Sequence, residues 1–187
     1  MSRLILVVPR GRHTSGRAVF LGGDGAPRLP PFAILATADR AAGARQGNPR
    51  CDPLRAFGDT PTGVYLVAGA LPPRRGGLGA LILAPAGGAA LDALRAGRTR
   101  FLLHGGRLDL RGELRATFGG VRVSDTDLAA LFAAINRAHA ESDPLGSVEI
   151  VEQEDSSAGA AATPAPPRRR GRRDFVELAL LTLAVAA

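Results

Sequence analysis

Short apolar runs, each stopped by a proline or by glycines, are the feature that most constrains the fold of this chain. The first run covers residues 4–8 and ends at Pro9, and the second covers residues 18–21 and ends at the glycine-rich turn 22–25. Runs of this length between turn residues are typical of β-strands, whereas a helix that spans a bilayer needs about 20 consecutive apolar residues. The pattern therefore predicts a β-rich domain and no transmembrane helix.

Further runs of the same kind predict the remaining strands. We expect strands over residues 1–9, 17–21, 32–37, 63–68, 78–83, 100–103 and 147–152. Two helices are expected between them, over residues 88–96 and from Ser124 onward, where Ser124 and Asp127 form a capping-box pattern. The polar stretch 41–59 is expected to be a long loop, a type of segment that is more often functional than idle. We therefore predict a mostly β (β-rich α+β) fold, in which residues 1–152 form one domain with two helices packed on a curved sheet or sandwich.

The composition supports a globular core and excludes several kinds of site. Hydrophobic residues make up 45% of the 187 residues and aromatic residues only 4%, so we expect a core of Leu, Val, Ile and Ala. The single cysteine, Cys51, cannot form an internal disulfide. Together with three scattered histidines it forms no cluster with metal-ligand spacing. We therefore predict no metal site and no cofactor.

Positive charge and apolar residues are concentrated at the C-terminal end of the chain. All 24 basic residues are arginines, the net charge is +7, and an arginine cluster lies at 168–173. Residues 153–173 contain no large apolar side chain and predict a flexible linker, and residues 174–187 form a short apolar segment. Residues 168–187 are compatible with a membrane or protein partner, and also with a solvated charge run. Nucleic acid ranks below both, because a chain with one tyrosine offers no aromatic stacking platform.

Three short segments place polar residues and glycines next to predicted strands. They are Gly58-Asp59-Thr60-Pro61-Thr62-Gly63-Val64-Tyr65, Leu102-Leu103-His104-Gly105 and Thr117-Phe118-Gly119-Gly120-Val121-Arg122-Val123-Ser124. Each has an ordinary structural explanation when taken singly: a type I turn, a hydrogen-bonded histidine at a strand end, and a glycine turn before a helix. Their order and spacing together carry more information.

The order and spacing of these segments resemble the catalytic domain of the YkuD-type L,D-transpeptidase family, over roughly residues 3–152. The resemblance extends to Gly47-Asn48-Pro49 and Asp52-Pro53 upstream. It implies the family's fold and reaction, in which a cysteine thiolate attacks a peptidoglycan stem peptide, expels its terminal D-alanine and passes the acyl group to an amine. It also implies a place in the cell envelope, although the apolar run at the N-terminus is shorter than the core of a secretory signal peptide and predicts a strand.

By this resemblance, two sets of residues match positions of the family's motifs. The catalytic motif is matched by His104, Thr117, Gly119 and Arg122, with Gly120 at the position of the nucleophile. The segment on the substrate side is matched by Thr60, Pro61, Thr62, Gly63 and Tyr65. The resemblance implies that peptidoglycan stem peptides are the binding partner.

Two departures from the family pattern change the expected function. Phe118 stands where the family has its second histidine, and Gly120 stands where it has the nucleophilic cysteine. Loss of a nucleophile removes most of the rate enhancement, so we expect an inactive or impaired enzyme that binds stem peptides. Two alternatives stay open: Cys51 could supply a thiolate from the long loop, or the chain could be an interaction protein that works through its tail. Ser124 is better explained as a helix cap than as a nucleophile.

Overall fold

The computed structural model of the protein describes residues 1–12, 14–73 and 78–153. No helix among these residues is long and apolar enough to cross a membrane. The predicted linker over 153–173 and the apolar segment 174–187 lie outside the described residues, except that Gln153 ends the last strand. The hypothesis of a membrane or protein partner bound through residues 168–187 therefore stays a prediction.

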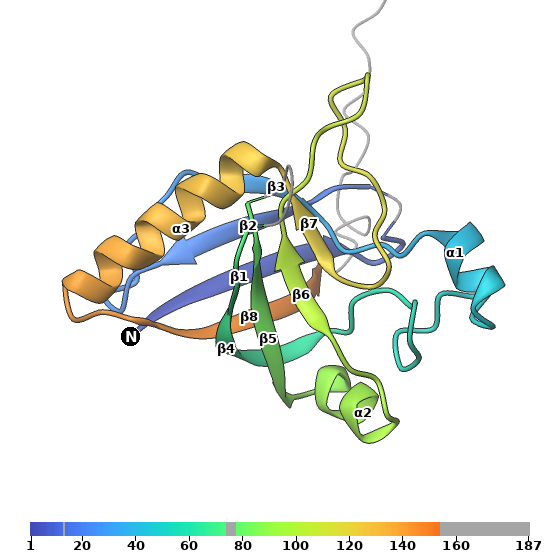
Figure 1. Ribbon diagram of the computed structural model, residues 1–187. Helices are drawn as coiled ribbons and strands as arrows, with labels where there is room; N and C mark the ends of the chain where they lie inside the picture. The colour runs from blue at the N-terminus through green and yellow to red at the C-terminus, as the bar shows by residue number, and fades with distance from the viewer. Residues whose placement is uncertain (13, 74–77, 154–187) are drawn as a thin grey trace, which may run out of the picture. The chain divides into compact units, whose positions relative to one another are not determined.

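Eight strands of the described chain close into a single barrel (Figure 1). They are β1 (Ser2–Pro9), β2 (Gly16–Leu21), β3 (Phe32–Leu35), β4 (Gly63–Leu71), β5 (Ala80–Gly87), β6 (Phe101–His104), β7 (Val121–Val123) and β8 (Leu145–Gln153). Around the barrel the order is β1-β2-β3-β7-β6-β5-β4-β8; β1 pairs with β8 and β6 with β7 in parallel, and the other pairs are antiparallel. The predicted mostly β class is confirmed, but the sheet closes on itself rather than remaining an open curved sheet or a sandwich.

The alternating pattern of β1 explains how the first strand joins the core. Leu4, Leu6 and Val8 are at most 1% exposed, while the residues between them are more exposed and lie on the outer face. Because β1 pairs with β2 on one side and with β8 on the other, the first and last strands meet and complete the ring. An eight-stranded barrel has an interior just wide enough for side chains to fill it, and here the filling is mostly aliphatic.

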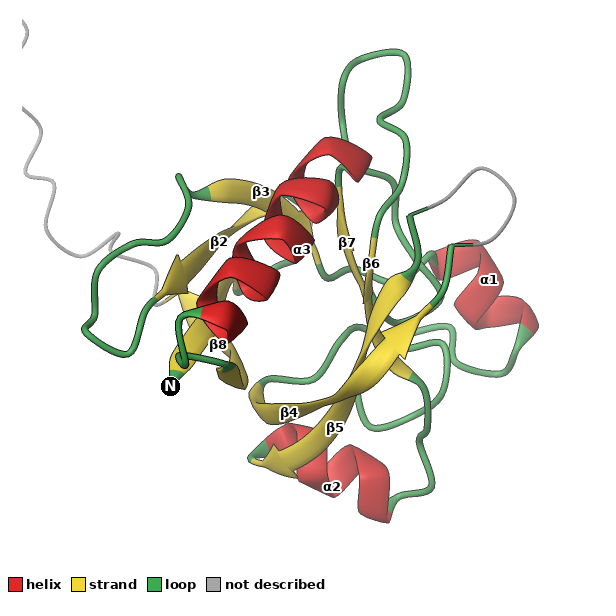
Figure 2. Cartoon of the chain, turned by 60° about the vertical axis from the view of Figure 1, so that its left-hand side comes forward, coloured by secondary structure: helices red, strands yellow, loops and turns green. Residues whose placement is uncertain are grey.

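Three helices accompany the described strands: α1 (Arg40–Arg45), α2 (Ala89–Arg95) and α3 (Asp125–Ala140). The predicted cap of α3 is confirmed, because the Ser124 hydroxyl accepts a hydrogen bond from the Asp127 N–H at 3.0 Å. Leu128 and Leu131 of this helix are fully buried in the core cluster. Figure 2 shows α3 running across the ring of strands.

The sequence patterns predict neither α1 nor β7. Helix α1 lies largely within the stretch expected to be a loop, has six residues, and begins after Asp39, whose carboxylate accepts from the Ala42 N–H at 2.7 Å. Strand β7 has three residues and forms because it pairs with β3 on one side and with β6 on the other. Strand β7 depends on pairing with distant strands, which a local apolar pattern does not encode, and α1 has no apolar stripe that would mark it as a helix.

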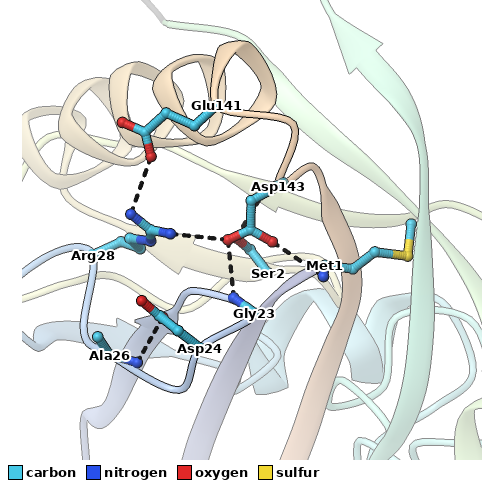
Figure 3. Close-up of polar contacts among 8 residues, drawn as sticks. All are labelled: Met1, Ser2, Gly23, Asp24, Ala26, Arg28, Glu141 and Asp143. Carbon is cyan, nitrogen blue, oxygen red and sulfur yellow. Dashed lines mark hydrogen bonds and ion pairs between the residues drawn. The ribbon is translucent and has the colours of Figure 1, made fainter.

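Asp143 ties the end of α3 to the start of the barrel (Figure 3). Its Oδ2 atom accepts from the Ser2 hydroxyl at 2.8 Å, from the Gly23 N–H at 2.9 Å and from the Arg28 guanidinium at 3.1 Å. Arg28 also pairs with Glu141 at 3.1 Å. The N–H of Gly23 and the hydroxyl of Ser2 favour the charged carboxylate and hold the pKa of Asp143 well below its usual range. This cluster joins the end of α3 to the first residues of β1 and to the turn that follows β2.

Candidate functional site

A cavity of about 620 Å³ lies beside β6 and the segment that enters β7. Four of the residues that match the catalytic motif line it: His104, Thr117, Gly120 and Arg122. They meet because β6 and β7 run parallel, with His104 directly paired with Arg122. The other lining residues are Ala56, Phe57, Arg98, Thr99, Arg100, Leu102, Ala116 and Phe118. The fold thus brings two of the three predicted segments to one cavity.

His104 ends β6 and presents one ring nitrogen that is free to accept a proton. Its Nδ1 atom lies 2.9 Å from the Gly105 carbonyl oxygen, and because a carbonyl can only accept, Nδ1 carries the hydrogen. The lone pair is therefore on Nε2. Burial lowers the pKa of His104, so the ring is neutral at pH 7 and has the form that a general base needs.

Gly120 leaves an empty position directly beside this imidazole. A Cβ atom built on Gly120 would lie 3.4 Å from the Cδ2 atom and 3.6 Å from the Nε2 atom of His104. It would also lie 2.8 Å from the Leu102 carbonyl oxygen, a contact too short for a real Cβ atom, so the backbone of β6 or of the turn would have to move to accept a side chain. A side chain at position 120 would therefore emerge next to the free nitrogen of the histidine, as a nucleophile next to its base does.

The Thr117 hydroxyl is fully engaged by the backbone of the adjacent turn. Its Oγ1 atom accepts from the N–H groups of Gly119 and Gly120, both at 3.0 Å, and donates to the Gly120 carbonyl at 2.7 Å. Two converging N–H groups are the arrangement that stabilises an oxyanion in acyl transfer, and here they already bind Thr117. Thr117 therefore shapes the turn and has no hydroxyl proton left for a nucleophilic role.

Arg98 is a buried cation that the sequence patterns do not reveal. The residue is 3% exposed, and the central carbon of its guanidinium lies 5.2 Å from the centre of the Phe101 ring. Burial lowers the pKa of Arg98 to about 10. Within the described chain it pairs with no carboxylate. It donates instead to the backbone carbonyls of Pro53, Gly58, Asp59 and Gly119.

The residues predicted on the substrate side lie behind the cavity rather than along it. Thr60 is fully buried, and its hydroxyl donates to the Gly119 carbonyl at 3.3 Å. Tyr65 is fully buried in the barrel and donates to the Pro61 carbonyl at 2.7 Å. The predicted set that does not line the cavity is Thr60, Pro61, Thr62, Gly63 and Tyr65. This segment supports the turn at Gly119 and leaves contact with a ligand to other residues.

The wall of the cavity combines positive charge with an aromatic pair. Arg98, Arg100 and Arg122 line it, and no acidic residue is among its lining residues. The Nε atom of Arg122 is buried without a hydrogen-bond partner within the described chain. Phe57 and Phe118 pack edge to face with ring centres 6.4 Å apart, and Phe118 is 70% exposed. Such a wall fits an anionic ligand that also has an apolar part.

Cys51 is poorly suited to replace the missing nucleophile. The residue is 4% exposed, its Sγ atom lies 4.0 Å from the Ala38 carbonyl oxygen, and it is not among the residues that line the cavity. Burial, assisted by the charge of Asp59, raises the pKa of the thiol, which disfavours the reactive thiolate. The geometry therefore argues against the alternative in which Cys51 performs the reaction.

Comparison with known proteins adds no identification: no protein-family model and no curated protein matches the chain.

Among residues 1–12, 14–73 and 78–153, no group of three or more His, Cys, Asp or Glu side chains is arranged to hold a metal ion. What the cavity can do therefore follows from its own side chains: a neutral imidazole, three guanidinium groups, two aromatic rings and an empty position at Gly120.

We predict that Arg98→Lys lowers the free energy of unfolding by about 3 kcal/mol, because an ammonium group cannot reach several carbonyls at once as a planar guanidinium does. Chemical denaturation in urea measures the loss. Arg95→Lys is the matched control, since the Arg95 side chain is 71% exposed and should change stability by less than about 0.5 kcal/mol. Equal effects of the two substitutions would show that the carbonyl contacts of Arg98 contribute little.

We predict that Gly120→Cys creates a reactive thiol, because His104 can accept its proton. Labelling by iodoacetamide at pH 7 should be at least about tenfold faster than labelling of Cys51 in the parent chain. Adding His104→Ala to Gly120→Cys should remove this advantage. Labelling that is equally fast with and without the histidine would contradict the geometry assigned to position 120.

Proposed function

We propose that this protein is an L,D-transpeptidase-like protein that binds peptidoglycan stem peptides in the cavity beside β6 and β7 without forming a covalent intermediate. The observation that carries the proposal is the position of Gly120, where a side chain would emerge 3.6 Å from the free nitrogen of His104. The base and its surroundings are in place, and the atom that would form the thioester is missing.

Two of the three requirements of acyl transfer are unmet in the cavity. A base is present at His104, but a glycine cannot form a thioester and the hydroxyl of Thr117 is bound to the backbone. The N–H groups of Gly119 and Gly120, which could stabilise an oxyanion, are bound to Thr117 as well. These contacts support reversible binding rather than turnover.

The charges of the cavity favour a stem peptide as the ligand. Such a peptide carries carboxylates on its diaminopimelate residue and on its terminal D-alanine, and guanidinium groups bind carboxylates through paired hydrogen bonds. Arg100 and Arg122 both line the cavity, and Arg122 has an unpartnered Nε atom there. The neutral His104 can accept a hydrogen bond from a peptide N–H through Nε2. Phe118 gives the aliphatic part of the peptide an apolar surface.

Calorimetric titration with a tetrapeptide that contains diaminopimelate and ends in D-alanine tests the proposal. We expect saturable binding by the parent chain, and about tenfold weaker binding by Arg122→Gln because one charged hydrogen bond is lost. Arg137→Gln, an exposed arginine on α3, is the matched control and should bind like the parent. Intact-mass spectrometry of the same mixture should show no adduct and no released D-alanine.

Absence of binding in the parent chain would contradict the proposal, and so would equal weakening by Arg122→Gln and Arg137→Gln. A covalent adduct would show that a residue of the cavity still performs acyl transfer, which would replace binding by catalysis as the function.

A further inference from the structure

The loop between β6 and β7 carries the most exposed large apolar side chain of the described residues. Leu110 is 105% exposed, and Leu108, two residues before it, is 46% exposed. Figures 1 and 2 both show this loop, residues 105–120, extending away from the strands. A single exposed leucine is ordinary on a protein surface, but here two lie within three residues of each other on a projecting loop and next to arginines.

The end of this loop is a compact turn. The Oδ1 atom of Asp109 accepts from the N–H groups of Arg111 and Glu113 at 2.8 and 3.0 Å. The Asp109 N–H donates to the Glu113 carbonyl at 2.9 Å, and the Gly112 N–H donates to the Asp109 carbonyl at 3.0 Å. These bonds hold the two leucines at the tip, so ordering them on contact with a partner costs less entropy than it would in an open loop.

Arg107 and Arg111 directly flank the segment Leu108-Asp109-Leu110 in this tip. Arg107, Arg111 and Arg115 are exposed, and within the described chain none of them forms an ion pair. The carboxylate of Asp109 is bound to the N–H groups of the turn, and the hydrogen bonds from Glu113 and Arg111 lower its pKa. The tip carries three arginines against two acidic residues, Asp109 and Glu113, so its exposed leucines are flanked by guanidinium groups and the tip has a small net positive charge.

Two further exposed leucines stand at the end of β4 and just before β5. Ala80, the first residue of β5, pairs with Leu71 of β4 and with His104 of β6, so the β4–β5 turn and the loop begin at one level of the barrel. Leu71 is 40% exposed and Leu78 is 38% exposed. Exposed leucines thus occur on both connections at this end, in addition to the tip itself.

We propose that the tip of the 105–120 loop inserts Leu108 and Leu110 into the interface of an anionic lipid surface, with Arg107 and Arg111 at the level of the headgroups. Burial of apolar side chains and attraction between arginines and anionic lipids are the two terms that hold peripheral proteins at a membrane. This inference is independent of the stem-peptide function, because it uses none of the residues that line the cavity.

A lipid surface fits the tip better than a protein partner does. A stable protein interface buries roughly 800 Å² on each side, over a broad and shape-complementary patch. The tip offers two exposed leucines on one turn, with Arg107 and Arg111 next to them in the sequence. A fluid interface accepts such a shape without a matching pocket.

A single tryptophan can test the insertion, because the chain contains none. Leu110→Trp should give a blue-shifted emission on anionic phosphatidylglycerol vesicles and be quenched by brominated acyl chains. Leu94→Trp is the matched control, since Leu94 is 41% exposed and lies on α2, at the other end of the barrel (Figures 1 and 2). Its emission should change little. The C-terminal arginines are the same in both variants, so they cannot produce the difference.

The arginines are tested by a second pair of variants in vesicle sedimentation. Arg107→Gln with Arg111→Gln should weaken binding to anionic vesicles about tenfold, since each basic residue near such a surface contributes about 1 kcal/mol. Arg45→Gln with Arg50→Gln removes the same charge from exposed positions outside the loop and should weaken it less.

Four results would overturn the proposal. The first is a Leu110→Trp emission that neither shifts nor is quenched while the protein sediments with the vesicles. The second is an equal response at positions 94 and 110, and the third is an equal loss from the two arginine pairs. A blue shift that depends on protein concentration without vesicles would instead assign the tip to contact between two copies of the chain, and would also overturn it.

Discussion

The buried guanidinium of Arg98 is the interaction on which the candidate site depends. A charge removed from water without a carboxylate partner is costly unless its donors are satisfied. Here four backbone carbonyls, from residues 53–59 and from Gly119, accept its hydrogen bonds. One side chain therefore holds a long irregular segment against the glycine turn that precedes β7. Arg98 therefore fixes the Gly119–Gly120 turn against residues 53–59, while the pairing of β6 with β7 sets the position of the turn next to His104.

The remaining contacts of the turn come from two threonines with different roles. Thr117 bonds the N–H groups of the turn from one side, and Thr60 bonds its Gly119 carbonyl from the other. Together with Arg98 they hold position 120 beside the imidazole. Arg98 and the two threonines thus fix the backbone at position 120, where Gly120 provides no side chain beside the imidazole. Because this side chain is missing and the N–H groups of the turn are bound to Thr117, we propose binding rather than turnover in the cavity.

The strands could be predicted because their information is local. Apolar runs that end at turn residues indicate β1 and β2, and the Ser124 and Asp127 pattern indicates the start of α3, where the hydrogen bond is found at 3.0 Å. The meeting of His104 and Arg122 was implied by a resemblance and is explained by the register of β6 and β7. The closure of the barrel could not be predicted, because it depends on the pairing of β1 with β8 across the whole domain.

Arg98 shows what the sequence conceals in the site. An arginine next to Gly97 at the end of a short helix has the local pattern of a solvated charge, and only the distant carbonyls that surround it give it a buried role. The pairing of Phe57 with Phe118 is equally long-range, since 60 positions separate the rings in sequence. Helix α1 is not predicted because it has only six residues and no apolar stripe of its own, and Asp39 alone marks its start.

The most direct test of the central claim is an amide NMR titration of the ¹⁵N-labelled parent chain with the diaminopimelate tetrapeptide, followed by its intact mass. The account predicts saturable shifts concentrated in residues 98–104 and 116–122, with the mass unchanged. Shifts spread elsewhere, no shifts at all, or a mass increase that corresponds to an acylated protein would contradict it.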